Sequence, residues 1–325
     1  MHDYVDKLII IDKPGYNNVD IENLALNYVV DVDYIICCGD IDTSRFPKSK
    51  IIGNKDTGAV NDKYKLYKKL HKNFLMPDTY LVSSMDEADE IVQNYPDKRF
   101  ITKPVNGSGG KNIKWFDARF EYDDKFLLQE FVDGNSVSTS FLAYPDHSTT
   151  MVTSSDQIIA PRGLDKSDFS YCGNITPCIN HIDKLENISQ KIARMYKLVG
   201  SNGVDFIIKD NKAYVIEVNP RIQGTFECVE NSYNMNMAQA HIDACSGVEV
   251  QMNPVSSFCV KLIVFSQKKA CYDLRNIDCV HDLCDMNYVY DVGDPIATLV
   301  VSDKILENAM SRTRSLQNLI YNSSF

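Results

Sequence analysis

The chain has 325 residues, of which 44% are hydrophobic and 24% are charged, and its net charge at pH 7 is −10. This length and composition are typical of a soluble globular protein with roughly two or three lobes. The negative charge argues against a nucleic-acid partner, which requires a basic surface, and no apolar run is long enough to span a bilayer. Residues 1–4 lack the basic and apolar stretches of a secretion signal, so we expect a cytoplasmic protein without a membrane partner.

The sequence has ten cysteines but no C-x-x-C pair. Cys37, Cys38, Cys259 and Cys279 lie in apolar stretches, where a reduced cysteine packs as a small hydrophobic residue. We therefore expect structural thiols rather than a disulfide or metal framework. The exception to examine is Cys172, which lies in a polar stretch.

Residues 1–58 predict a small βαβ unit, with strands at Val5–Ile11 and Tyr34–Cys38 and a helix between them. Residues 59–134 predict a second lobe that contains a glycine-rich loop. Its expected elements are a helix at Asn61–His71, a strand at Thr79–Val82, a helix at Met85–Tyr95 and a strand at Phe100–Lys103.

Residues 135–250 predict a third lobe, and residues 251–325 a β-rich closing segment with a helix at Asp303–Ile320. In the third lobe residues 161–180 have no clear period and are expected to form a long loop. The other elements expected there are a helix at Ile188–Leu198, strands at Gly203–Lys209 and Ala213–Val218, and a helix near Met235–Cys245. The predicted fold class is α+β or α/β.

Lys103 is followed by the loop Asn106-Gly107-Ser108-Gly109-Gly110. A lysine ammonium supplies a point charge, and glycines let backbone N–H groups approach phosphate oxygens closely. The loop does not end in Gly-Lys-Ser/Thr, so it is not a Walker A loop. A simple glycine-rich turn between two strands explains this segment equally well.

Asp205, Glu217 and Asn219 lie on the two strands that the turn Asp210-Asn211 joins. Strand alternation places Glu217 and Asn219 on one face, and Asp205 on the partner strand can join them there. Carboxylate and amide oxygens bind Mg²⁺ beside phosphates, so we favour a metal site over a solvated polar face. Arg221 alternates to the same face and can bind a phosphate or carboxylate.

Five segments in this order resemble the ATP-grasp superfamily. They are Asp62-Lys63, Ile101-Thr102-Lys103-Pro104, Gln129-Glu130-Phe131-Val132-Asp133-Gly134, Gly203-Val204-Asp205-Phe206 and Glu217-Val218-Asn219-Pro220-Arg221. The stretches Glu217–Glu227 and Tyr171–Pro177 are most similar to predicted ATP-dependent carboligases related to biotin carboxylase. The resemblance implies an ATP-grasp fold with a short N-terminal βαβ domain.

The resemblance also implies roles for individual residues. Lys63 and Lys103 would hold ATP phosphates beneath a flap made by Gly107, Ser108, Gly109 and Gly110. The segment Glu130, Phe131 and Val132 would meet the adenine, and Asp133 would reach the ribose. Asp205, Glu217 and Asn219 would bind Mg²⁺, or Mn²⁺ in its place, while Arg221 and Lys103 would stabilise the transferred phosphoryl group. From the polar stretch 161–180 we add Arg162, Cys172 and Asn174 as weaker candidates for the acceptor side.

The implied activity is an ADP-forming ligase that activates a small carboxylate and joins it to an amine. A small-molecule phosphotransferase would use the same motifs, and a non-catalytic nucleotide-binding regulator is a third reading. Thr225 stands where biotin carboxylases have a glutamate that handles bicarbonate, which argues against biotin carboxylation. ATP-grasp enzymes are often homodimers, so a second copy of the chain is an expected partner.

Overall fold

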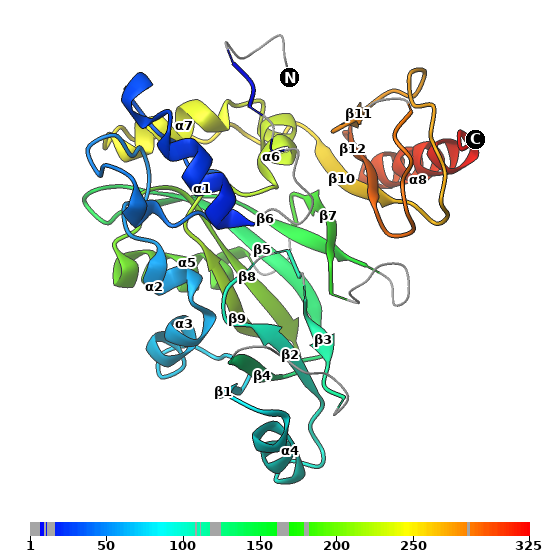
Figure 1. The fold of residues 1–325 in the computed structure, drawn as a ribbon. Coiled ribbons are helices and arrows are strands. Elements are labelled where there is room, and N and C mark those ends of the chain that lie inside the picture. Colours follow the sequence, from blue (N-terminus) through cyan, green and yellow to red (C-terminus); the bar gives the residue numbers. More distant parts are fainter. Residues whose placement is uncertain are drawn as a thin grey trace.

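The computed structural model describes residues 7–9, 11, 17–107, 109–110, 112–117, 125–160, 169–178, 182–284 and 287–325. Within these residues the strands form two antiparallel sheets, one of four strands and one of eight (Figure 1). Helices pack around both sheets, so the predicted mixture of α and β structure is confirmed. No helix among the described residues is long and apolar enough to cross a membrane.

The smaller sheet has the strand order β1-β4-β2-β3. Its strands are β1 (Thr79–Val82), β4 (Phe126–Glu130), β2 (Phe100–Pro104) and β3 (Lys114–Trp115). Helix α4 (Met85–Gln93) packs against one face, where Ala88 of the helix meets Phe100 and Leu128 of the sheet. Because neighbouring strand residues point to opposite faces, Lys103 and Gln129 point away from α4 and line a cleft.

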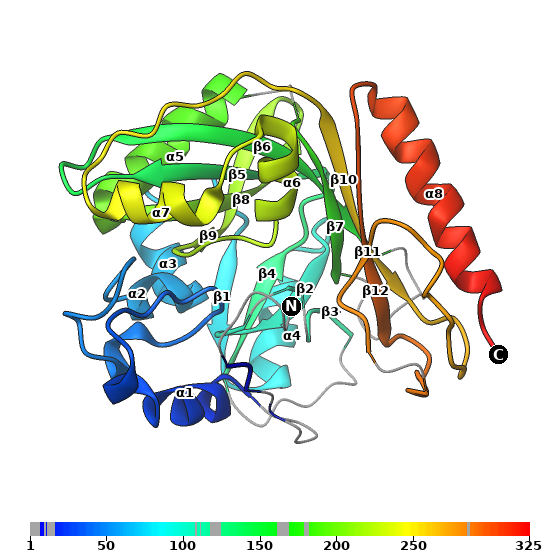
Figure 2. The ribbon, with the colours of Figure 1, turned by 90° about the horizontal axis from the view of Figure 1, so that it is seen from above.

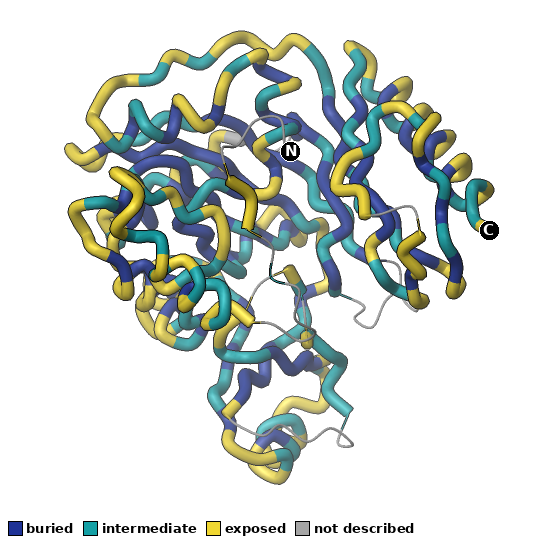
Figure 3. Tube along the Cα trace, turned by 45° about the horizontal axis from the view of Figure 1, so that its top comes forward, coloured by how far each residue is buried: buried dark blue, intermediate teal, exposed yellow. Residues whose placement is uncertain are grey.

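The larger sheet has the strand order β11-β12-β10-β7-β6-β5-β8-β9. Its strands are β11 (Val280–His281), β12 (Pro295–Asp303), β10 (Phe258–Phe265), β7 (Tyr171–Thr176), β6 (Thr149–Ile159), β5 (Asn135–Ala143), β8 (Gly200–Lys209) and β9 (Lys212–Asn219). Figure 3 shows that buried residues follow these strands closely. The strands of the predicted third lobe and those of the closing segment therefore belong to one sheet.

Helices cover both faces of the larger sheet. On one face α2 (Gly58–Asn61), α3 (Lys63–Leu70) and α5 (Ile182–Tyr196) share a core with the sheet that includes Leu66, Ile192 and Phe206. On the other face α6 (Phe226–Tyr233) and α7 (Met237–Cys245) pack against Leu142 and Val152. Helix α8 (Leu306–Asn322) packs beside β10 and β12 at the outer edge (Figure 2).

The N-terminal region differs from the predicted βαβ unit. It contains α1 (Asn18–Leu26) and the short helices η2 (Val29–Asp31) and η3 (Thr43–Arg45). In place of the strand Tyr34–Cys38 there is one parallel bridge between Ile35 and Ile51. Of the strand Val5–Ile11, residues 7–9 and 11 carry no strand, and the rest lies outside the described residues. The apolar run does not reflect burial, because Tyr34 is 67% exposed.

Two other segments refine the prediction. The helix predicted at Asn61–His71 is present as α3, which begins after Asp62 because that side chain accepts the N–H groups of Tyr64 and Lys65; Asn61 is the last residue of the preceding α2. The stretch 161–180 is not one long loop, since residues 171–176 form β7 between β6 and β10. The predicted hairpin of β8 and β9 is confirmed, with Asp210 and Asn211 at φ 48° and 58° in its turn.

Candidate active site

The two sheets face each other across a cleft of about 1100 Å³. The smaller sheet contributes Lys103 and Gln129, and the larger sheet contributes Asp205 and Glu217. The segment that follows β9, from Asn219 to Thr225, closes one end. A concave site between two lobes is the usual place for a small-molecule ligand.

Asp205, Glu217 and Asn219 meet as their spacing predicts. Asp205 pairs with Glu217 in the β8–β9 register, and the Asn219 amide donates to Asp205 Oδ2 at 3.0 Å. Gln157 of β6 donates to the other carboxylate oxygen, Oδ1, at 3.1 Å. The pKa of Asp205 is raised to about 7, chiefly by burial and next by the nearby Glu217 carboxylate, while the Asn219 hydrogen bond opposes both. Two carboxylates held this close, one of them buried, favour a cation between them.

The donor set fits Mg²⁺ that is shared with phosphate oxygens. Among the described residues no three or more His, Cys, Asp or Glu side chains gather into a metal site, so a fully protein-built cage is absent there. Mg²⁺ characteristically takes one or two carboxylates and completes its six positions with water and substrate phosphates. Asp205, Glu217 and the amide oxygen of Asn219 match that pattern.

Lys103 and Lys63 place two ammonium groups beside this carboxylate pair. Lys103 on β2 is only 3% exposed, and burial lowers its pKa to about 7, an effect that Lys63 strengthens and Glu217 opposes. Lys63, the first residue of α3, contacts Glu217 Oε1 at 2.9 Å and donates to the carbonyl of Gly107. An anion in the cleft would stabilise the charged form of Lys103.

The glycine loop packs against the start of β7. The carbonyl of Gly109 accepts the Tyr171 N–H at 3.2 Å. Gly110 has φ +76°, and a Cβ there would lie 2.0 Å from the carbonyl oxygen of Phe169. Only glycine fits that position. Of the four predicted flap residues, Ser108 lies outside the described residues.

The predicted base-binding segment lines the other end of the cleft. The N–H of Glu130 donates to the Asp78 carbonyl at 2.8 Å. The backbone group of Glu130 that can bind a ligand is therefore its own carbonyl oxygen. Its carboxylate pairs with Lys98 at 3.1 Å. Asp133 is 76% exposed at its side chain and pairs with Arg99 at 3.1 Å.

An aromatic wall adjoins that segment. The ring centroids of Trp115 and Phe131 lie 4.5 Å apart, and those of Trp115 and Phe169 lie 5.2 Å apart. The Arg99 guanidinium lies 4.7 Å from the centroid of Phe131. Flat apolar surfaces of this kind suit the faces of a purine ring.

Gln223, which the sequence analysis did not single out, lies in the cleft two residues after Arg221. It is 7% exposed, and Ser140 Oγ donates to its Oε1 at 2.7 Å. Among the described residues no hydrogen bond uses its amide nitrogen, so this donor remains for a ligand. A Cβ on Gly203 would lie 1.9 Å from that nitrogen. The glycine that precedes Asp205 therefore makes room for Gln223.

The acceptor-side candidates need correction. Cys172 and Asn174 lie within β7 and not in a loop, and they are 5% and 0% exposed. The Asn174 amide donates to Thr176 and accepts from Tyr171, so its hydrogen-bonding groups are used inside the sheet. Neither residue is among those that line the cleft. Arg162 lies outside the described residues, and all ten cysteines are free thiols.

Comparison with known proteins agrees with this geometry. The model of the ATP-grasp domain family matches residues 60–225. An uncharacterized protein of Methanocaldococcus jannaschii is 31% identical over 306 residues, which cover 90% of this chain and 76% of that protein. The tyramine–L-glutamate ligase of the same organism is 31% identical over 151 residues, covering 45% of this chain and 42% of the ligase.

A solved structure shares the fold. The biotin carboxylase domain of Hydrogenobacter thermophilus 2-oxoglutarate carboxylase, a dimer in complex with MgADP, ADP and bicarbonate, matches with a TM-score of 0.70. The match has 15% sequence identity and covers 95% of this chain and 77% of that chain. Two antiparallel sheets that enclose a cleft with lysines on one side and acidic residues on the other define the class. The chain belongs to the ATP-grasp family, and the predicted resemblance and fold are confirmed.

Proposed function

We propose that this chain is an ADP-forming ligase that phosphorylates a small carboxylate with ATP and joins the acyl group to an amine. The observation that carries the proposal is the position of Lys103, Glu217 and Arg221 around one cleft. Phosphoryl transfer to a carboxylate requires a cation for the phosphates, a ligand for the metal and a second cation for the reacting oxygens. The tyramine–L-glutamate ligase among the relatives supports this choice, since its name describes the joining of a carboxylate and an amine.

In this proposal the ATP phosphates lie over Lys63 and Lys103, and the base lies against the wall of Trp115 and Phe131. The carbonyl of Glu130 and the N–H of Val132 face the edge of the base. Asp205, Glu217 and Asn219 would hold Mg²⁺, which would neutralise phosphate charge when bound. Lys103 becomes fully protonated beside the phosphates, because their negative charge offsets its burial.

The carboxylate substrate lies at the end of the cleft away from the base, where the amide nitrogen of Gln223 donates to it and the Arg221 guanidinium contacts the phosphoryl group that it receives. One carboxylate oxygen attacks the γ-phosphorus, the bond from that phosphorus to ADP breaks, and an acyl phosphate forms. The amine nitrogen then attacks the acyl carbon, inorganic phosphate leaves, and the nitrogen gives up a proton. The protein contributes mainly by positioning the reactants and excluding water.

Thr225 argues against carboxylation of biotin as the reaction. It is 4% exposed, and its hydroxyl lies 3.2 Å from Ser140 Oγ. A threonine hydroxyl cannot serve as the acidic group that biotin carboxylases place at this position. The amine and the carboxylate are otherwise open, and the first experiment is chosen to identify both.

The test is incubation of the protein with Mg·ATP and a pool of small metabolites, followed by mass spectrometry and separate measurement of ADP and AMP. We expect ADP together with a new product whose mass equals that of two metabolites less one water. The control is Glu217→Gln, which keeps the shape of the side chain and removes its charge. A phosphorylated metabolite without a condensed product would support a phosphotransferase instead, and AMP as the main nucleotide would refute the acyl-phosphate route.

A further inference from the structure

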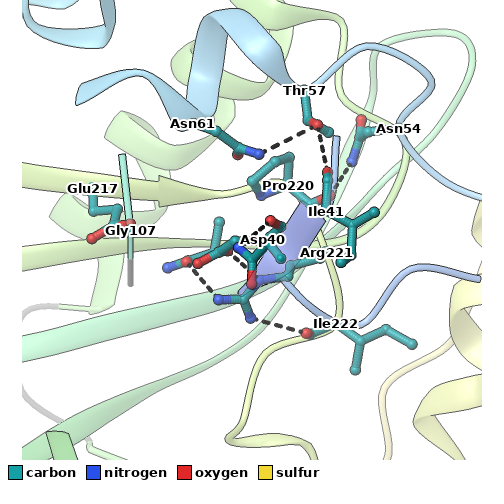
Figure 4. Close-up of polar contacts among 12 residues, drawn as sticks. Asp40, Ile41, Asn54, Thr57, Asn61, Gly107, Glu217, Pro220, Arg221 and Ile222 are labelled. Carbon is teal, nitrogen blue, oxygen red and sulfur yellow. Dashed lines mark hydrogen bonds and ion pairs between the residues drawn. The ribbon is translucent and has the colours of Figure 1, made fainter. Parts of the chain in front are cut away.

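Arg221 lies two residues after the end of β9, outside the hydrogen-bonded part of the sheet. Two of its guanidinium contacts are long, with Nη1 donating to the Ile222 carbonyl and Nη2 to Asn219 Oδ1, both at 3.4 Å. The short contact is Nε to Asp40 Oδ1 at 2.9 Å, in an ion pair whose side chains are 17% and 15% exposed. Figure 4 shows Asp40 and Arg221 pointing toward one another. Asp40 is therefore the contact that determines how the guanidinium is turned.

Asp40 reaches this position from a segment 181 residues away in sequence, and that segment is itself held firmly. The Asn18 amide of α1 donates to the Asp40 carbonyl at 2.7 Å. The next carbonyl, of Ile41, accepts from Thr57 Oγ1 at 3.3 Å (Figure 4). The backbone that carries the Asp40 carboxylate is thus fixed by hydrogen bonds on both carbonyls.

Asn54 from the same N-terminal region holds the backbone on the other side of Arg221. Its amide nitrogen donates to the Pro220 carbonyl at 2.9 Å and to Asn202 Oδ1 at 2.7 Å, and its oxygen accepts the Val199 N–H at 2.9 Å. Asn54 is 8% exposed. The residue that precedes Arg221 is therefore anchored to the core by a buried side chain of the N-terminal region.

Stability alone is a poor explanation for this ion pair. Desolvating two charges costs about as much as their attraction returns, so a buried pair is weak evidence for a stabilising role. A guanidinium whose Nε is bound to a carboxylate has its planar fork oriented, with Nη1 and Nη2 left to bind another anion. Among the residues that the structure describes, those two nitrogens make only the long contacts, and Arg221 lines the cleft.

We propose that Asp40 is a positioning residue that orients the Arg221 guanidinium toward the transferred phosphoryl group. This inference rests on the proposed function insofar as it needs phosphoryl transfer in the cleft, but not on the identity of the carboxylate or amine. The N-terminal region then contributes to catalysis through Asp40, a residue outside the five segments that resemble the ATP-grasp superfamily. Misplacing a reacting group's partner by about 1 Å typically costs about 100-fold in rate.

The test compares Asp40→Asn with Asp42→Asn, which changes the same charge two positions away at an exposed residue that contacts Ser44 and not Arg221. Binding is followed by the fluorescence of Trp115, the only tryptophan, which lines the cleft. The probes are magnesium with ADP, and magnesium with ADP and aluminium fluoride, which imitates a phosphoryl group in transfer. We expect both variants to bind MgADP within about twofold of wild type, because Asp40 is not among the residues that line the cleft. Aluminium fluoride should tighten binding to wild type and Asp42→Asn, and Asp40→Asn should lose about tenfold or more of that gain.

A double-mutant cycle separates orientation of Arg221 from a purely structural role. Arg221→Ala should reduce the gain from aluminium fluoride, and adding Asp40→Asn should reduce it no further. A further loss in the double variant, an undiminished gain in Asp40→Asn, or no gain in wild type would each overturn the assignment. Should Asp40→Asn fail to fold, Asp40→Glu serves instead, since it keeps the charge and displaces it by one methylene.

Turnover distinguishes this inference from the proposed function. With the substrates that the metabolite screen identifies, Asp40→Asn should lower kcat about 10- to 100-fold and leave the KM for ATP nearly unchanged. A variant that forms the ligation product at the wild-type kcat would refute the role of Asp40 and leave the ligase intact. If aluminium fluoride tightens binding in an Asp40-dependent way but the protein forms no ligation product, the role of Asp40 would stand and the ligase activity would be refuted.

Discussion

The pH dependence of nucleotide binding offers a direct test of Lys103. Its side chain is 3% exposed, and its pKa lies at about 7 compared with an ordinary value of 10.5. That difference corresponds to about 5 kcal/mol against charging the lysine in the empty cleft. A bound polyphosphate raises the pKa again, so binding takes up a proton. Affinity is therefore full below the pKa of the free protein and falls as the pH rises above it.

The expected size follows from the fraction of Lys103 that is protonated. With a pKa of about 7, this fraction is about 24% at about pH 7.5 and about 1% at about pH 9. If only the protonated form binds well, the affinity for ADP falls about 25-fold over this interval. The terminal phosphate of ADP is already fully ionised there, since its second pKa is about 6, so the ligand does not contribute.

The assay is a titration of ADP without metal, in the presence of a chelator, followed by the fluorescence of Trp115. Omitting the metal avoids competition with protons at Asp205, whose pKa also lies at about 7. Lys103→Met is the control, because it keeps a similar volume and cannot titrate. A wild-type affinity that does not change over this interval, or the same decline in Lys103→Met, would refute the reasoning.

Three further substitutions test other parts of the site. Glu217→Ala should lower ADP formation by at least about 100-fold, since it removes a predicted metal ligand, and substantial turnover would remove Glu217 from that role. Gly203→Ala should displace Gln223, because its Cβ would lie 1.9 Å from the amide nitrogen, and should destabilise the fold by about 1–3 kcal/mol in chemical denaturation; unchanged stability and turnover would contradict this. Asn54→Ala leaves the Pro220 carbonyl and other buried groups unpaired, so we expect a loss of about 1–3 kcal/mol, and a variant as stable as wild type would show that water replaces them.

The acidic half of the site was predictable because it is local. A two-residue turn joins β8 and β9, and strand alternation places Glu217 and Asn219 on one face. A register shift between Asp205 and Phe206 then brings Asp205 opposite Glu217, where the regular register of the turn would place Ile216. Lys103 and its glycine loop are likewise contiguous. Spacing along the chain and strand alternation are therefore enough to predict that these groups belong to two local segments.

Strand β7 escaped prediction for the opposite reason. It lies in the middle of the larger sheet, but buried side chains such as Asn174 and Thr176 are polar and hydrogen-bond within the sheet, as in the 2.7 Å contact of Thr176 with Ser155 of β6. Hydrophobic alternation, on which the prediction of strands depends, is therefore missing. The apolar run near Tyr34 misled in the other direction, since Tyr34 and Ile36 are exposed and none of its residues is buried.

The chain order of short motifs was enough to identify the family and to predict a phosphate loop and a metal-binding hairpin, because each motif is formed by neighbours in sequence. The contacts of Lys63 with Glu217, of Asp40 with Arg221 and of Gln223 with Ser140 join residues 154, 181 and 83 positions apart. No periodicity records such pairs. They arise when the two sheets and the N-terminal region close around one cleft, since burial then requires each charge and amide to find a partner.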